Sequence, residues 1–404
     1  MVAWHVVSNT VLVLSWVLAL WWVFQGITGI AGMATLPDLT CIDASALAEI
    51  PASDEPDLTV VVPACNEEEA IEATLRSLLA STGIKLQIVA VDDRSADRTG
   101  ERMDAVAVGA RGGTHEMEVV HNKELPPGWL GKPHALKLGV ERARARWILT
   151  TDGDVTFAPE VLGLAVRHAI TVGTDHLVLI PTLLWEGIGE AAMHASIQAL
   201  AQWAVRLWKV KEKGSKDALG VGGFTLMRRE TLEAVGGLER MRMEVVEDVS
   251  LGFLVKEAGF RSSVALGPGL VKIRWMCGFF GIVGNMEKNG FAGFRYKLRV
   301  AIPAVLALVG QAVIPLAAMF MGGWGIAAGL LTYAGIVMTM IGTRKLSGIS
   351  PLAGLLYGPC ILVVAWALAR STVLTIARDG VVWRGTHYPL SELRKNAVQW
   401  RQAS

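Results

Sequence analysis

Hydrophobic and polar positions divide this chain of 404 residues into three parts. No charged residue lies between His5 and Asp38, and the apolar run there is long enough for a membrane helix, which needs roughly 20 residues. From residue 45 to 298 short apolar runs alternate with amphipathic stretches, and long apolar runs return after residue 300. The pattern predicts a transmembrane helix over 1–37, a mixed domain over 45–270 and further transmembrane helices over 300–370.

Charges beside the apolar runs predict how the chain crosses the membrane. No basic stretch precedes the first run and no A-x-A site follows it, which favours an anchor over a cleaved signal peptide. Basic residues at 295–299 and 344–345 predict a cytoplasmic middle domain in a multi-pass protein of the inner or plasma membrane. Four spans would put the basic, membrane-proximal tail, 371–404, outside. Either the tail is external, or one apolar segment is re-entrant or interfacial.

The middle domain has the pattern of an α/β sheet. An apolar run from Leu58 to Val62 ends at Pro63, and an amphipathic helix is predicted from about Glu67. The plan repeats with a strand near 86–93 and a helix that begins near Ser95, then with strands near 116–122 and 147–150 around a helix over 132–144. Strands that alternate with helices predict a mostly parallel sheet with helices on both faces.

Polar side chains follow three of these strands. In a parallel sheet the ligand lies beyond the carboxyl ends of the strands, so these side chains are candidates for one binding edge. Asp152 and Asp154 offer two hard oxygen ligands, which suit Mg²⁺ or Mn²⁺, although an Asp-Gly-Asp sequence also forms simple turns. The candidates are Asn66, Glu67, Asp92, Asp93, Asp152 and Asp154.

Two later segments add to this chemistry. Gly220, Gly222 and Gly223 precede a strand and a helix and allow a ligand to approach closely. Glu247 and Asp248 begin a predicted helix, where an acid is either an N-terminal cap or a general base.

Composition excludes several functions. The chain is 52% hydrophobic and 19% charged, which is too apolar for an ordinary soluble protein and too charged for a pure membrane bundle. A net charge of +1 gives no basic field for nucleic acid. The four cysteines lack zinc-site spacing, and no G-x-G-x-x-G or P-loop sequence is present. The apolar segments carry no charge before Arg370, so a transporter is not favoured.

As a set, the motifs resemble family 2 glycosyltransferases of the GT-A fold. The resemblance covers about 58–265, and the flanking apolar segments are similar to those of bacterial hopanoid-associated and ceramide-glucosyltransferase-like members. The motifs that carry it are VVPACNEE, VDDRSADRTG, GKPHALKLG, TTDGD, GVGGFTLMRRETLEAVGGL and VVEDVSLG.

The resemblance implies a role for each motif. The first strand end, Pro63, Ala64, Asn66 and Glu67, would hold the nucleotide of a nucleotide sugar, with UDP the expected carrier.

Asp93, with Asp92 beside it, would contact the base, and Lys132 would lie near the phosphates. Asp154 and Asp152 would bind a divalent cation, Asp154 more directly, and Asp152 would also contact the donor.

Asp248 would be the catalytic base, with Glu247 as the second candidate. The implied reaction is an inverting transfer of a sugar to an acceptor hydroxyl.

The sequence departs from processive synthases, which carry Gln-x-x-Arg-Trp after the base. Here the match is VKIRW, with Val271 in place of Gln and with Arg274 and Trp275 kept, which favours transfer of a single sugar. The segment 271–299 mixes aromatic and basic residues and is predicted to be interfacial, or alternatively a buried core helix. If it is interfacial, Arg274, Trp275, Lys288 and Asn289 are candidates for contact with a lipid acceptor and the membrane. A processive synthase and a non-catalytic GT-A scaffold remain the alternatives.

Overall fold

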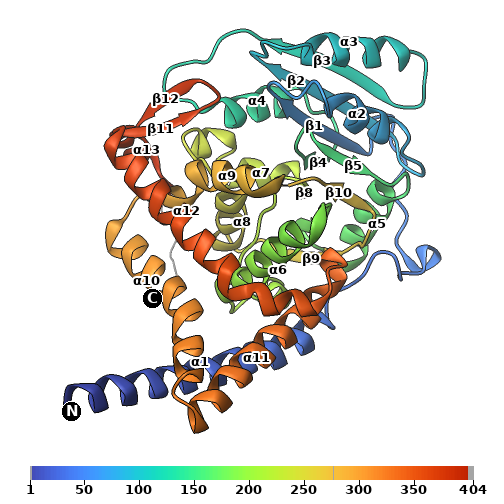
Figure 1. Cartoon of the computed structure of the whole chain (residues 1–404). Helices are drawn as coiled ribbons and strands as arrows, with labels where there is room; N and C mark the ends of the chain where they lie inside the picture. The colour runs from blue at the N-terminus through green and yellow to red at the C-terminus, as the bar shows by residue number, and fades with distance from the viewer. Residues whose placement is uncertain (1, 276, 399–404) are drawn as a thin grey trace. The chain divides into compact units, whose positions relative to one another are not determined.

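The structure, a computed structural model, describes residues 2–275 and 277–398, which pack as two units (Figure 1). The sheet unit comprises Leu36–Leu184, Lys209–Arg274 and the described residues from Lys395 on. The helical unit comprises the described chain up to Thr35, with Trp185–Trp208 and Trp275–Arg394. Trp185–Trp208 therefore packs with the helices, whereas the sequence pattern predicted one continuous domain over 45–270.

A seven-stranded sheet forms the centre of the sheet unit. Strand β8 runs antiparallel to both of its neighbours, β4 and β6, and the remaining pairs are parallel. The mostly parallel α/β sheet predicted from the sequence is thus confirmed, with one antiparallel strand that was not predicted. In spatial order the strands are β3 (Glu116–Asn122), β2 (Leu86–Asp93), β1 (Leu58–Ala64), β4 (Trp147–Thr150), β8 (Thr225–Arg228), β6 (His176–Ile180) and β9 (Ser262–Leu266).

Helices and a smaller sheet surround this centre. The smaller sheet has the order β5 (Val155–Phe157), β10 (Val271–Ile273) and β7 (Thr182–Leu183). The helical segments of the unit are η1 (Ala44–Ala46), α2 (Ile71–Leu79), α3 (Thr99–Gly109), α4 (Gly131–Val140), α5 (Val161–Val172), α7 (Arg229–Ala234), η3 (Leu238–Met241) and α8 (Glu247–Glu257).

Strand β1 is central, and all seven of its residues are buried. The sequence predicted that Pro63 ends this strand, but β1 continues to Ala64. Pairing with β4 stops at Val61, whereas pairing with β2 continues through Pro63. Pro63 has no N–H to donate, and it is tolerated in the strand because β4 no longer pairs with β1 at that position.

The helices after β1 and β2 begin later than predicted. Helix α2 begins at Ile71 rather than Glu67, and α3 begins at Thr99 rather than near Ser95. The intervening loops bind each other instead. The Asn66 N–H donates to Ser95 Oγ at 3.1 Å, and Asn66 Oδ1 accepts from the Ala96 N–H at 2.8 Å. These bonds join the carboxyl ends of β1 and β2 into one edge.

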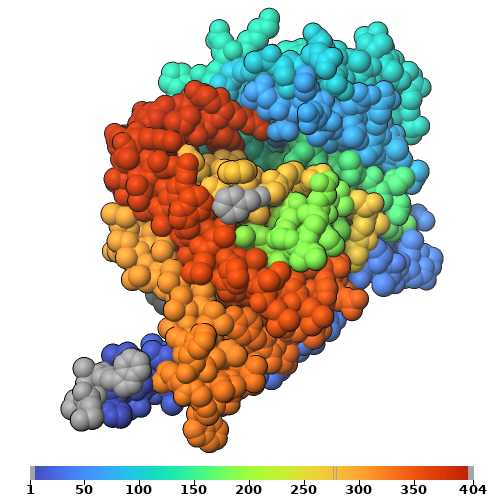
Figure 2. All heavy atoms as spheres, in the orientation of Figure 1, coloured from blue at the N-terminus to red at the C-terminus, as the bar shows by residue number. Residues whose placement is uncertain are grey.

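Among the residues that the structure describes, four helices of the helical unit are long and apolar enough to cross a membrane: His5–Met33, Leu298–Met319, Gly323–Ser347 and Pro351–Ala377. The exposed side chains at the tip of the hairpin formed by Leu298–Met319 and Gly323–Ser347, orange in Figure 2, are apolar, with Phe320 93% and Trp324 73% exposed. The elements of this unit are α1 (Val2–Met33), α6 (Gly187–Ala204), α9 (Gly278–Gly293), α10 (Leu298–Met319), α11 (Gly323–Ser347), η4 (Pro351–Leu356), α12 (Tyr357–Ala377), β11 (Gly380–Trp383) and β12 (Thr386–Pro389). Two short elements, η2 (Leu207–Lys209) and α13 (Leu390–Asn396), begin in this unit and end in residues of the sheet unit.

Helices α1 and α11 lie side by side because small residues let their backbones approach (Figure 1). A Cβ at Gly335 would lie 2.6 Å from the carbonyl carbon of Trp22 and from the backbone nitrogen of Val23. Both are backbone atoms, so a side chain at this position would have to separate the two helices.

Gly335→Ala is therefore expected to lower the free energy of unfolding by about 1–3 kcal/mol, because it overpacks a helix contact. Thermal unfolding in detergent measures the effect. Gly293→Ala at the end of α9 is the matched control, since a Cβ there meets nothing within 4 Å. Equal midpoints for the two variants would contradict the close packing of α1 and α11.

Candidate active site

The carboxyl ends of β2, β1 and β4 lie side by side in the sheet. The register pairs Ala64 with Asp92 and Asp93 with Asn122, and β4 ends at Thr150, two residues before Asp152. The candidates that follow these three strands therefore share one edge, as the sequence predicted. Residues from α4, α8 and the loop before β8 complete this edge.

Lys132 connects three segments at this edge. Its Nζ lies 2.6 Å from Asp152 Oδ1 and 2.6 Å from Glu247 Oε1. The Glu247 side chain is only 6% exposed. Burial lowers the pKa of Lys132, but the carboxylates of Asp152, Glu247 and Asp248 outweigh burial and hold that pKa well above its usual value. Lys132 therefore remains a cation and neutralises carboxylates that would otherwise repel one another.

Asp248 is held by backbone donors instead. Its Oδ2 accepts from the Gly222 N–H at 2.7 Å, and its Oδ1 accepts from the Val249 N–H at 2.8 Å. Burial and the neighbouring charge of Glu247 raise the pKa of Asp248 to about 6, against the lowering effect of Lys132. Adjacent residues thus differ: Glu247 is bound to the lysine, and Asp248 is a partly buried carboxyl group with a pKa near neutrality.

The glycine-rich segment before β8 packs tightly against these acids. A Cβ at Gly222 would lie 2.6 Å from Asp152 Oδ2 and 3.2 Å from Lys132 Nζ. A Cβ at Gly220 would lie 1.8 Å from the carbonyl oxygen of Asp248. In the structure Gly220 lies against the backbone of Asp248 and Gly222 lies against Asp152 and Lys132, so the segment forms part of the candidate edge. The close approach of a ligand to these glycines stays a prediction.

Asp152 and Asp154 have the donor chemistry that a hard divalent cation requires. Burial, together with the negative charges of Asp152 and Glu67, raises the pKa of Asp154 to about 7. A cation would relieve this repulsion, and Mg²⁺ usually takes one or two protein carboxylates, its other ligands being water and substrate phosphates. Among the described residues, no group of three or more His, Cys, Asp or Glu side chains is arranged as a metal site. The donor set therefore fits a cation shared with a phosphate.

Asp93 is buried and already paired. Arg94 donates to both of its oxygens, at 2.9 and 2.8 Å, and Asn122 Nδ2 donates to Oδ1 at 2.8 Å. Burial raises the pKa of Asp93, but these hydrogen bonds outweigh burial and hold the pKa below its usual value. Arg94 and Asn122 were not predicted from the sequence, because their importance depends on pairing between β2 and β3.

Asp92 faces a different partner from Asp93. His121 Nδ1 lies 3.1 Å from Asp92 Oδ2, and its Nε2 lies 3.1 Å from Asp104 Oδ1. The hydrogen bond to Asp92 is the largest of the effects that raise the pKa of His121. The two aspartates at the end of β2 are thus held in different ways.

The four candidates for acceptor contact are divided between the units. Arg274 is exposed and belongs to the sheet unit, whereas Trp275, partly buried with its ring 6.2 Å from that of His194, belongs to the helical unit. Lys288 and Asn289 lie on α9, where Lys288 Nζ is 4.5 Å from the ring centroid of Trp383. The structure therefore groups three of the four with the helices.

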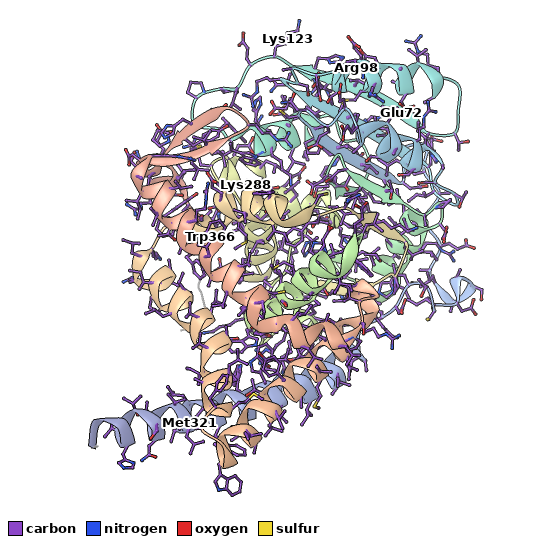
Figure 3. All side chains as sticks on the ribbon, in the orientation of Figure 1. Glu72, Arg98, Lys123, Lys288, Met321 and Trp366 are labelled. Carbon is purple, nitrogen blue, oxygen red and sulfur yellow. The ribbon has the colours of Figure 1, made fainter. Side chains whose placement is uncertain are left out.

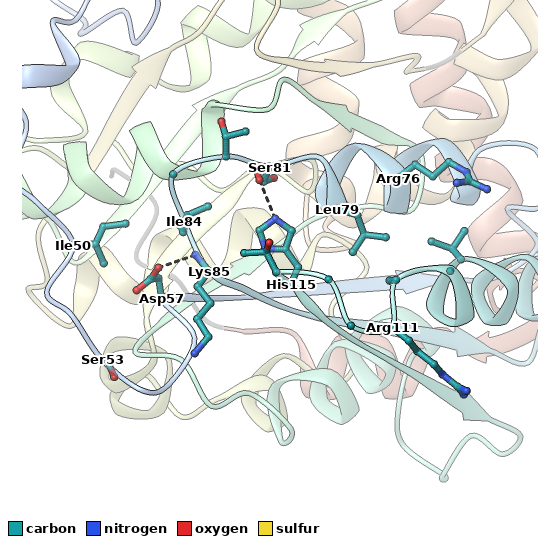
Figure 4. Close-up of a pocket in the computed structure, with 18 of the residues that line it drawn as sticks. Ile50, Ser53, Asp57, Arg76, Leu79, Ser81, Ile84, Lys85, Arg111 and His115 are labelled. Carbon is teal, nitrogen blue, oxygen red and sulfur yellow. Dashed lines mark hydrogen bonds between the residues drawn. The ribbon is translucent and has the colours of Figure 1, made fainter.

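A cavity of 1390 Å³ opens in the sheet unit among residues that precede β1, β2 and β3 (Figure 4). It lies at the amino ends of the strands, away from the carboxylates. Its polar groups serve the fold: Asp57 Oδ2 accepts from the Lys85 N–H at 2.7 Å, and His115 Nε2 lies 2.9 Å from the Ser81 carbonyl oxygen. We therefore place the candidate active site at the opposite edge of the sheet.

Comparison with known proteins identifies the family of the central segment. Residues 59–236 match the family model described as Glycosyl transferase family 2. This segment is a family 2 glycosyltransferase domain. It contains Lys132, Asp152 and Asp154, and ends just before Glu247 and Asp248.

Two relatives match parts of this chain at low identity. The succinoglycan biosynthesis protein ExoO of Rhizobium meliloti is 33% identical over 31% of this chain and 33% of its own length. The 4,4'-diaponeurosporenoate glycosyltransferase of Staphylococcus aureus is 25% identical over 63% of this chain and 66% of its own length. The chain thus spans between one third and two thirds of these relatives.

A solved structure shares the fold. The mannosyltransferase PcManGT from Pyrobaculum calidifontis, in complex with GDP-Man and Mn²⁺, aligns with a TM-score of 0.52 at 16% identity. The alignment covers 91% of this chain and 99% of that one. The GT-A architecture predicted from the sequence is confirmed, while the hopanoid-associated and ceramide-glucosyltransferase-like subtypes remain predictions.

The shared lysine leads to a test of stability. Lys132→Met leaves Asp152 and Glu247 without their cation and is expected to cost about 3 kcal/mol of unfolding free energy, because one partner of a buried ion pair is lost. Denaturant unfolding of the detergent-solubilised chain measures this loss. Adding Glu247→Gln should restore part of it, since one of the two stranded charges is then removed.

Lys137→Met is the matched control on the same helix. Lys137 pairs with Glu141 and Glu239, whose side chains are 50% and 61% exposed, so its loss should cost about 0.5 kcal/mol. A Lys132→Met variant as stable as Lys137→Met would show that the three-way ion pair does not hold the edge together.

Proposed function

We propose that this protein is a membrane-bound inverting glycosyltransferase that moves one sugar from a nucleotide sugar, with UDP the expected carrier, to a hydroxyl group of a lipid. The observation that carries the proposal is the separation of the acids into two sets. Glu247 and Asp152 bind Lys132, whereas Asp248 is held by two N–H groups and has a pKa of about 6. A base poised near neutrality beside a hard-oxygen donor set is what a transfer from a diphosphate requires.

In the proposed reaction Asp248 removes the proton of the acceptor hydroxyl, and the oxygen attacks the anomeric carbon from the face opposite the diphosphate. A new carbon–oxygen bond forms, the bond to the diphosphate breaks, and the nucleoside diphosphate leaves. A divalent cation held by Asp154 and Asp152 would neutralise charge on the leaving group. Lys132 adds a fixed positive charge at the same edge.

The first two strand ends are the proposed nucleotide site. Asn66 and Glu67 follow β1 in the loop joined to the end of β2, and Asp93 is oriented by Arg94 and Asn122. Asp92 is oriented by His121. The structural relative was solved with GDP-Man, so GDP-mannose belongs in any donor panel beside UDP sugars.

Transfer of a single sugar to a lipid is supported by the second unit. Four apolar helices fit a multi-pass protein of the inner or plasma membrane, with the glycosyltransferase domain in the cytoplasm. Val271, where processive synthases have Gln, is buried in β10 and pairs with Phe157. A buried apolar side chain at that position cannot donate a hydrogen bond to a growing polymer. The name of one relative, a diaponeurosporenoate glycosyltransferase, also supports a small acceptor rather than a polymer.

The decisive experiment offers the solubilised full chain a panel of UDP sugars and GDP-mannose with Mg²⁺ or Mn²⁺ and measures nucleoside diphosphate release with and without a lipid extract. Asp248→Asn is expected to lower turnover by about 10²–10⁴-fold, because a general base contributes that much. Asp154→Ala should abolish the metal-dependent release of the nucleoside diphosphate, because the cation loses one of its two proposed protein ligands.

Glu160→Gln is the control, since Glu160 is an exposed carboxylate of the same unit outside the candidate edge, and it should retain full turnover. If no donor is bound or cleaved in the presence of lipid, the chain is a non-catalytic scaffold. Release of long oligosaccharides would indicate a processive synthase instead.

The pH profile provides a second test of Asp248. A base works only when ionised, and the pKa of Asp248 is raised to about 6, so its ionised fraction falls as the pH drops through 6. We expect kcat/KM to decline about tenfold per pH unit below that value and to stay level above it. If kcat/KM stayed constant down to pH 4.5, about one and a half pH units below the pKa of Asp248, the base would have to be another residue.

A further inference from the structure

Both ends of the helical segment Trp275–Arg394 continue into the sheet unit. At its end Lys395 leads to Val398, which is buried in a core cluster of that unit. A folded unit lies on one side of a membrane, so a segment that leaves it and returns to it crosses an even number of times. The described part of this segment contains three candidate spans, which are α10, α11 and Pro351–Ala377. At least one of the three therefore does not cross.

Helices α1 and α11 run in the same direction. Gly335 lies against Trp22, and a Cβ at Gly342 would lie 3.2 Å from the carbonyl carbon of Gly29. Between these two contacts both helices advance by about two turns towards their carboxyl ends, so they are parallel. Helix α1 leads into the sheet unit, which begins at Leu36. Helix α11 therefore also runs towards the side of the sheet unit.

Helix α12 runs in the wrong direction for the next crossing, because consecutive crossing helices alternate in direction. At its start the Tyr357 hydroxyl donates to Gln311 Oε1 at 2.8 Å, more than halfway along α10. Near its end Arg370 Nη1 donates at 2.7 Å to Glu287 Oε2 on α9, which lies between the sheet unit and the start of α10. Helix α12 is thus antiparallel to α10 and runs towards the sheet unit, as α11 does.

Element η4 turns the chain back along α11 after that helix ends. A Cβ at Gly354 would lie 3.1 Å from Val337 Cγ2, and a Cβ at Gly358 would lie 3.1 Å from the Tyr333 hydroxyl oxygen. These contacts move towards the start of α11, so η4 leads inwards and α12 leads back out. The apolar segment Pro351–Ala377 is thus divided between an inward part and an outward part.

Charged side chains hold the end of α12 beside α9 (Figure 1). The two oxygens of Glu287 accept from Arg370 Nη1 and Arg378 Nη1, each at 2.7 Å. Further along the chain, Arg394 Nη2 donates to the Tyr296 carbonyl oxygen at 3.1 Å. The hydrocarbon core of a bilayer is about 30 Å thick, so these bonds could not form if α12 carried Arg378 to the opposite face.

We propose that Pro351–Ala377 is a re-entrant segment, which enters and leaves the membrane on the side of the sheet unit, and that its outer face contacts the lipid hydrocarbon. The chain then crosses three times, through α1, α10 and α11, and the basic tail stays on the side of the sheet unit. The exposed side chains of this face are apolar and include Leu352, Leu362, Trp366 and Val373 (Figure 3). The inference rests on the proposed membrane placement of the helical unit and is independent of sugar transfer.

The test labels single cysteines of the full chain with a membrane-impermeant maleimide, before and after cells that express it are permeabilised. The exposed Cys41 and Cys277 are first replaced by serine, whereas Cys65 and Cys360 are buried and remain. The test position is Val382→Cys on β11, beyond the end of α12, where the side chain is exposed.

Two reference positions define the two sides of the membrane. Lys123→Cys is exposed on the sheet unit, and a Gly-Ser-Cys-Ser-Gly insertion after Met321 marks the tip of the α10–α11 hairpin (Figure 3). We expect the inserted cysteine to be labelled in intact cells, and both Lys123→Cys and Val382→Cys to be labelled only after permeabilisation. Gel filtration checks that each variant folds.

Two labelling results would overturn the proposal. Labelling of Val382→Cys in intact cells would show that α12 crosses the membrane. Labelling of the inserted cysteine only after permeabilisation would show that the α10–α11 hairpin does not cross.

A second measurement tests whether α12 lies in the lipid. A nitroxide attached to Leu362→Cys in reconstituted vesicles is expected to collide more often with oxygen than with a water-soluble nickel chelate, because oxygen concentrates in hydrocarbon. More frequent collisions with the nickel chelate would show that the outer face of α12 is in water, and would contradict the re-entrant segment.

Discussion

The ammonium group of Lys132 is the interaction on which the candidate active site depends. It joins the first turn of α4, the loop after β4 and the start of α8, because Asp152 and Glu247 both contact it at 2.6 Å. Without a cation these carboxylates would face each other at a partly buried edge, and like charges in that setting cannot all stay ionised. The lysine therefore lets several acids share one small space, while two backbone N–H groups hold Asp248.

Close backbone packing is the second constraint. Gly220 approaches the backbone of Asp248 so closely that no side chain fits there, and a side chain at Gly222 would displace the Asp152 carboxylate. The N–H of Gly222 reaches Asp248 because this segment lies against the acids. The glycine-rich segment thus shapes the site by bringing a hydrogen-bond donor to the proposed base. The same principle joins α1 to α11 in the helical unit, where Gly335 lies against the backbone of Trp22.

Much of the sheet could be predicted from the sequence because its signal is local. Continuous apolar runs mark β1, β2 and β4, and the polar residues that follow each run mark the functional edge. The antiparallel direction of β8, the small sheet and the packing of Trp185–Trp208 with the helices were not predictable in this way. Each depends on contacts between segments far apart in the chain, which periodicity does not record.

The sequence by itself determined which residues reach the edge: strand length and turn position bring Asn66, Asp93, Asp152 and Asp154 there, and the motif set indicated nucleotide-sugar chemistry. Only the tertiary structure decided how the acidic residues at this edge differ in their binding partners. Glu247 and Asp248 are neighbours with similar side chains, yet one binds Lys132 and the other accepts from Gly222. Lys132 precedes Glu247 by more than 100 residues and Gly222 precedes Asp248 by 26, so neither partner is a neighbour in sequence. The environment of a carboxyl group is set by what folds against it.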